Sequence, residues 1–176
     1  DVKRGLKQLE RENLEKAEQT FFEIKQSNPE NPLANYGLAR VYAHPEFEKK
    51  NLYKAYEYIL LANENANKIN KEILDEINDL FIPDSISVQR QIIDDKLYDE
   101  VAATRKVNKL NEFKKKCPQS FHFQDAVAKR NQLEFWNAKY QNTVFAFEQF
   151  IQKHPYADDV PEARKLRDEL DRKSTR

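Results

Sequence analysis

Methionine is absent from the 176 residues, glycine occurs twice and cysteine once. With only Gly5 and Gly37 available, the sequence disfavours β-hairpins and phosphate-cradling loops, because both rely on glycine for backbone conformations with positive φ. Cys117 has no second cysteine to pair with, which excludes an intramolecular disulfide. Since the chain begins at Asp1 and has no methionine, we expect it to be a piece of a longer protein or a processed form.

Long apolar runs and an excess of one charge are missing as well. The longest aliphatic stretch, near residues 58–62, is far shorter than the roughly 20 residues that cross a bilayer. We therefore expect no membrane insertion by this chain. Thirty basic and thirty acidic residues cancel, so no overall field favours nucleic acid or an anionic membrane surface.

Large apolar residues are present in helical patterns. Eleven Phe and eight Tyr are enough to build a core, and apolar residues recur mostly at spacings of three and four. These segments are 5–29, 32–45, 52–66, 69–83, 107–116, 123–139, 143–153 and 159–172, with one more that Asp84 or Ser85 caps and that runs through Val101. Prolines and polar residues separate them. The pattern predicts an all-α chain with about nine or ten helices.

One sequence motif occurs twice, 37 residues apart. Phe113 and Pro118 in the first copy correspond to Phe150 and Pro155 in the second. Further pairs are Val107 and Val144, Lys116 and Lys153, Ala126 and Ala163, Arg130 and Arg167, and Leu133 and Leu170. Each copy is a helix, a proline-bearing turn and a helix. Neither helix can bury its apolar stripe alone, so the repetition predicts packed helix pairs.

The spacing of several residues points to a known repeat. Ala17, Phe21 and Pro29 stand four and eight residues apart, and Thr143, Phe147 and Pro155 repeat these spacings. The same pattern includes Gly5, the trio Leu38, Ala39 and Tyr42, and the pair Ala55 and Ile59. This arrangement resembles the tetratricopeptide repeat, a helical hairpin of about 34 residues. The resemblance implies an α-solenoid of antiparallel helical hairpins that forms a right-handed superhelix.

The resemblance also divides the chain. Residues 1–66 would form two tetratricopeptide-like hairpins, 67–97 an irregular helical connector, and 98–176 two further hairpins and a charged tail. The last unit, from Tyr140 to Ala163, is similar to repeats of bacterial cell-division coordinator proteins and of the helical lipoprotein in the outer-membrane β-barrel assembly machine. This similarity favours the bacterial periplasm or outer membrane over the cytoplasm.

Candidate catalytic and metal-binding residues are few. Cys117, His122 and Asp125 could in principle supply a nucleophile, a base and an orienting carboxylate. However, Cys117 corresponds to His154 in the second copy, and a position that exchanges Cys for His is typical of a turn surface. No two histidines have the i, i+4 spacing of a helical zinc pair. We therefore expect no enzyme, no cofactor and no metal site.

Basic and aromatic residues cluster between 113 and 130, as in a platform for single-stranded nucleic acid. Phe113 recurs as Phe150, though, and a repeated Phe is better explained as core. Lysines at 114–116 would also complement the dipole at a helix C-terminus. The sequence therefore predicts no nucleic-acid partner.

Exposed side chains for a protein partner are predicted at two places. In the tetratricopeptide family the first helix of a hairpin lines the concave face, which in this chain implies a stripe of Tyr36, Arg40 and His44 at i, i+4 and i+8. Trp136, beside Phe135, is the second candidate, with one of the two rings in the core and the other partly exposed.

Two functions of different class remain open. The first is a non-enzymatic scaffold that binds a protein or peptide on its helical-repeat surface. The alternative is a docking or structural segment of a larger enzyme or envelope assembly whose activity lies outside this fragment. The sequence does not determine the oligomeric state.

Overall fold

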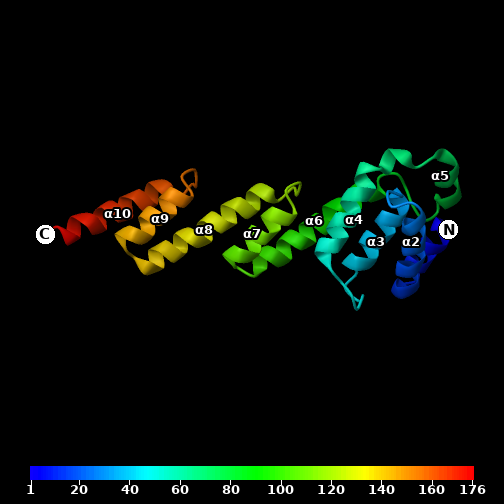
Figure 1. Cartoon of the computed structure of the whole chain (residues 1–176), viewed down its shortest axis with the longest axis horizontal. Coiled ribbons are helices and arrows are strands. Elements are labelled where there is room, and N and C mark those ends of the chain that lie inside the picture. Colours follow the sequence, from blue (N-terminus) through cyan, green and yellow to red (C-terminus); the bar gives the residue numbers. More distant parts are fainter. The chain divides into compact units, whose positions relative to one another are not determined.

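The computed structural model describes all 176 residues and contains ten α-helices, one short 3₁₀ helix and no β-strand (Figure 1). The all-α prediction is confirmed. The helices are α1 (Val2–Glu10), α2 (Leu14–Ser27), α3 (Pro32–Ala43), α4 (Leu52–Glu64), η1 (Ala66–Lys68), α5 (Lys71–Ile77), α6 (Ser85–Ala103), α7 (Val107–Lys116), α8 (Phe123–Gln141), α9 (Val144–Lys153) and α10 (Val160–Ser174).

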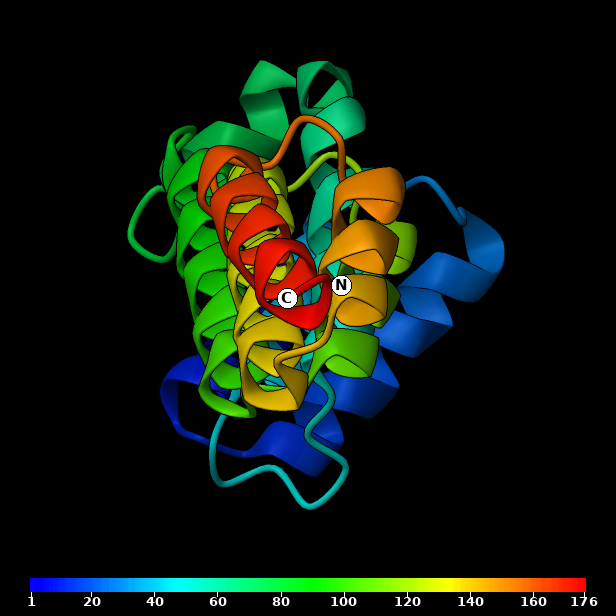
Figure 2. The ribbon, with the colours of Figure 1, turned by 90° about the vertical axis from the view of Figure 1, so that its left-hand side faces the viewer.

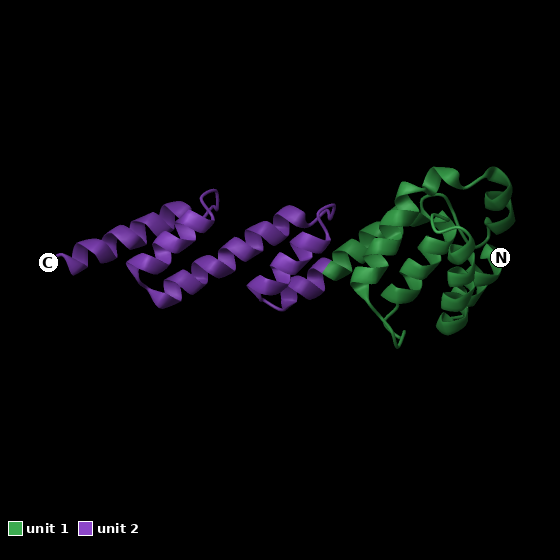
Figure 3. Cartoon of the chain, in the orientation of Figure 1, with its two compact units in different colours: residues 1–97 green, residues 98–176 purple.

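The chain forms two compact units, residues 1–97 and 98–176 (Figure 3). The boundary lies within α6. Segment 67–97, expected to be a connector, lies entirely in the first unit. Each unit has a core of its own.

The first unit is organised around the ring of Phe21 on α2, which is completely buried. The only two glycines of the chain lie against this ring. A Cβ atom built on Gly5 of α1 would approach the ring to 2.7 Å, and one on Gly37 of α3 to 2.3 Å. Neither glycine has a positive φ. Both glycines therefore serve close packing of α1 and α3 on α2, and not a turn.

The segment expected over residues 5–29 is two helices. Glu12 adopts the left-handed conformation with φ of 54°, and the N–H of Asn13 bonds to the carbonyl of Gln8 at 2.9 Å. This is a common way to end a helix. The apolar spacing continues across the break, so periodicity alone did not reveal it.

A polar cluster fixes the loop between α3 and α4. The carboxylate of Glu18 accepts a hydrogen bond from the Tyr42 hydroxyl at 2.7 Å and one from Lys49 Nζ at 2.8 Å. Burial raises the pKa of Glu18, but these two bonds outweigh it and the pKa lies below its ordinary value. Phe47, in the same loop, is buried with its ring 5.4 Å from that of Tyr42. The residues between α3 and α4 thus form an ordered loop.

The second unit repeats its backbone at the 37-residue offset. Helices α7 and α9 begin and end at equivalent residues, and α8 and α10 begin at equivalent residues. The N–H of Cys117 bonds to the carbonyl of Phe113 at 2.8 Å, and that of His154 to Phe150 at 2.9 Å. Figure 2 shows α9 and α10 side by side. The written repeat is therefore a structural repeat.

The core predictions for the repeated phenylalanines are confirmed. Phe21, Phe113, Phe147 and Phe150 are all buried. The interpretation of the position shared by Cys117 and His154 is wrong, because both side chains are buried as well. This position ends the first helix of the repeat, where the chain turns inward, and it can hold either side chain within the unit.

Candidate functional site

The predicted stripe on α3 does not lie on an open surface. Tyr36 is only 4% exposed, and its ring packs edge-on against Phe81 with centroids 5.2 Å apart. Phe81, itself buried, follows α5. The expectation that Tyr36 projects toward solvent is wrong, because the segment after α5 returns to α3 and covers it. That contact joins residues far apart in sequence and has no local signal.

The other two members of the stripe are partly exposed. The guanidinium of Arg40 lies 5.7 Å from the centre of the Tyr36 ring, and its Nη1 is 3.5 Å from the Tyr36 hydroxyl. His44 follows the last residue of α3, and its Nδ1 accepts a hydrogen bond from the N–H of Glu46 at 3.2 Å. Both side chains already have partners within the first unit.

Trp136 is 41% exposed, whereas its neighbour Phe135 is 2% exposed. The predicted division between a core ring and a partly exposed ring is confirmed. The guanidinium of Arg105 lies 5.6 Å from the centre of the Trp136 ring, and this geometry supports a cation–π interaction. Trp136 is in the second unit and Tyr36 in the first, so the two predicted sites lie in different units.

A groove with a volume of about 340 Å³ lies between α8 and α9 in the second unit. Its floor consists of Ala138, Ala146 and Phe150. Its sides are Glu134, Asn137 and Gln141 from α8 and Phe145, Gln149 and Lys153 from α9. The residues of each side are spaced by three or four, so they form one stripe on each helix. The two alanines leave the space between the stripes open.

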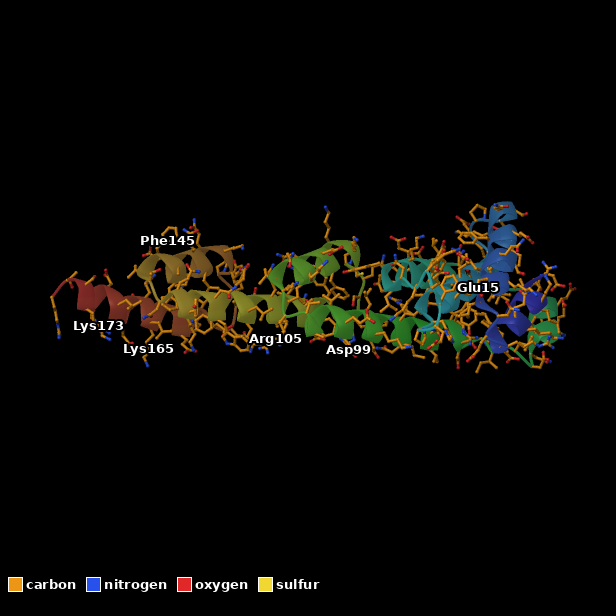
Figure 4. All side chains as sticks on the ribbon, turned by 90° about the horizontal axis from the view of Figure 1, so that it is seen from below. Glu15, Asp99, Arg105, Phe145, Lys165 and Lys173 are labelled. Carbon is orange, nitrogen blue, oxygen red and sulfur yellow. The ribbon has the colours of Figure 1, made fainter.

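The sides of this groove carry polar groups without partners. The side-chain amides of Asn137, Gln141 and Gln149 are exposed and make no hydrogen bond within the chain. Phe145 is 68% exposed and lies at the surface of α9 (Figure 4). An amide can donate to a carbonyl and accept from an N–H. The groove thus combines apolar area with groups that match a peptide backbone.

One end of the groove is closed by charges. Lys153 Nζ lies 2.8 Å from Glu134 Oε1, and His154 Nε2 bonds to the other carboxylate oxygen. Burial raises the pKa of Glu134, but the bonds from Lys153 and His154 outweigh it and the pKa lies below its ordinary value. Burial also lowers the pKa of His154, against the opposing effect of Glu134. A neutral imidazole that donates to a carboxylate fits both directions.

Two of the residues considered for chemistry, His122 and Asp125, are in contact. His122 Nδ1 lies 2.9 Å from Asp125 Oδ2, and its ring stacks on Tyr98 with centroids 4.6 Å apart. Cys117 is completely buried. No group of three His, Cys, Asp or Glu side chains is placed to hold a metal ion.

Comparisons with known proteins give no relative. No protein family matches the chain, and neither a curated protein nor a solved structure is similar to it. None of the ten helices is both long and apolar enough to cross a membrane.

The sequence contains a signal for the groove in the spacing of its residues. Phe145, Gln149 and Lys153 stand four residues apart, and Ala138 and Ala146 each lie four residues from Asn142, at the turn between the helices. Small residues near such a turn indicate a close approach of two helices and a shallow surface above them. The sequence alone could not show which side chains remain without partners.

Proposed function

We propose that this chain is a non-enzymatic protein-binding scaffold of tetratricopeptide-like hairpins. The repeat at 37 residues with coinciding helix bounds supports the hairpin architecture. So does the position of Phe21 on Gly5, since both match the pattern of that family. A right-handed superhelix and a place in the bacterial cell envelope are further parts of the proposal, which rest on the resemblance described above.

The observation that carries the binding function is the α8–α9 groove. Its three unpartnered amides surround an alanine floor beside the exposed ring of Phe145. Peptide binding in such a groove uses an apolar anchor for affinity and side-chain amides for the backbone of the ligand. The ligand would be an extended segment of a protein partner, with an apolar residue against Phe145 and Phe150.

Selection of displayed peptides on the chain, followed by fluorescence polarisation, tests this function. We expect the selected peptides to bind and to lose about tenfold or more in affinity with Phe145→Ala, because an aromatic anchor is removed. Tyr156→Ala is the matched control, since Tyr156 is 97% exposed and lies outside the groove. Equal affinity of the wild type and Phe145→Ala would exclude the groove as the binding site.

A further inference from the structure

A depression with a volume of about 490 Å³ lies in the first unit, where α1 meets the start of α2. Its lining is strongly basic. The residues that line it are Asp1, Lys3, Arg4, Lys7, Gln8, Arg11, Asn13 and Lys16. Five are cations and one is an acid. The first unit as a whole has 14 basic and 18 acidic residues and therefore a net negative charge. The lining of this pocket has the opposite sign.

Most of these cations are not neutralised within the chain. Lys7, Arg11 and Lys16 are exposed and have no ion-pair partner in the structure. Lys3 Nζ donates to a backbone carbonyl, that of Glu76, at 2.7 Å. Only Arg4 reaches a carboxylate across the surface, with 3.5 Å between its Nη2 and Glu23 Oε2. The carboxylate of Asp1 accepts from the N–H of residue 4 and so caps the helix.

The placement of Lys3 and Arg4 opposes the stability of the first turn of α1, whereas Lys7 in the last turn complements the helix dipole. Lys3 and Arg4 lie in the first turn, which contains no acidic residue, although the N-terminal end of a helix dipole disfavours cations. Lys3, Lys7 and Arg11 follow one another at i+4, so like charges face each other. An anion held among them would remove both penalties at once.

The start of α2 adds hydrogen-bond donors to the same pocket. Asn13 is the N-cap residue of α2, yet its side chain makes no capping bond, and it lines the pocket together with Lys16. Free N–H groups in the first turn of a helix favour an oxyanion. These N–H groups add to the attraction that the cation cluster exerts on an anion.

We propose that the basic pocket binds a multiply charged phosphate group. Several cations without partners require more than one negative charge on the ligand, and the guanidinium of Arg11 can bind two oxygens of a phosphate at once. The volume is within the range of small-ligand sites. This site is separate from the α8–α9 groove and does not depend on the function proposed for it.

Calorimetric titration of the chain with pyrophosphate at low ionic strength tests the proposal. We expect saturable binding that weakens as salt is added, because exposed charges are screened. The double variant Lys7→Ala/Arg11→Ala should lower the affinity about tenfold or more. Its matched control is Lys96→Ala/Lys165→Ala, which removes two exposed cations outside the pocket and should change the affinity less than about twofold.

Two further titrations identify the source of the phosphate and exclude a different ligand. Binding to phosphatidic acid vesicles that exceeds the response to pyrophosphate, and is lost with Lys7→Ala/Arg11→Ala, would assign the phosphate to a lipid headgroup, because a phosphomonoester can carry two negative charges. The proposal is overturned if neither phosphate probe binds, or if both double variants lose affinity equally. Tighter binding of a hexaglutamate peptide than of either phosphate probe at this pocket would also overturn it.

Discussion

The two units pack their helices around buried phenylalanine rings in different ways. In the second unit the helices follow a strict register, with alanines at equivalent places and a core of repeated phenylalanines. The first unit has glycines where its helices approach Phe21, an ordered loop after α3 and a returning segment that covers Tyr36. The strict repeat keeps Phe145 and Trp136 exposed at its surface. The irregular unit covers one face of α3 with its own chain.

The largest expected effect is loss of a repeated core ring in either unit. Phe21→Ala and Phe150→Ala should each lower the free energy of unfolding by about 3–5 kcal/mol, because each leaves a cavity in a buried site. Urea denaturation followed by circular dichroism measures the change. Tyr156→Ala serves as the exposed control, within about 0.5 kcal/mol of the wild type. An unchanged denaturation midpoint for Phe150→Ala would contradict the prediction that the repeated Phe belongs to the core.

A smaller effect on the free energy of unfolding is expected from substitution of a glycine in the first unit. In an exposed helix, Gly→Ala stabilises by about 1 kcal/mol. Gly37→Ala should instead destabilise by about 1–3 kcal/mol, because the added Cβ would meet three ring carbons of Phe21 at 2.3 to 2.5 Å. The same denaturation experiment with Phe21→Leu as background should show a smaller loss. Stabilisation by Gly37→Ala in the wild type would contradict the close packing.

The smallest effect is the pH dependence that Glu134 and His154 give to the stability of the second unit. Both Glu134 and His154 have a lowered pKa in the folded chain, so the unfolded chain binds more protons and stability falls as the pH falls. The loss begins near the ordinary pKa of 6.5 for histidine and continues below 4.5, the ordinary value for Glu134.

Denaturation at several pH values between 7 and 5 measures this dependence. His154→Gln should flatten the profile in that range, because the group that titrates there is removed while an amide can still donate to Glu134. Cys117→Ser alters the equivalent position of the first copy and should leave the slope unchanged. A wild-type profile that is flat between pH 7 and 5 would contradict the role assigned to His154.

Much of the fold could be predicted because it depends on local patterns. The spacing of apolar residues predicted the observed bounds of α7, and those of α9 to within one residue. The break at Glu12 and the short α5 were missed, since apolar spacing continues past both. The candidate site was predicted less well. The neighbours Phe135 and Trp136 were predicted to be one core ring and one partly exposed ring, without a choice between them, whereas the predicted exposure of Tyr36 was wrong.

The sequence by itself determined an all-α chain, its repeated phrase and the phenylalanines of its core, because these follow from spacing along the chain. Only the tertiary structure decided that Phe81 covers Tyr36 and that the two glycines flank one ring. The α8–α9 groove and the basic pocket were likewise decided there. These features depend on contacts between side chains of distant segments. The periodicity of apolar residues along the chain does not predict such contacts.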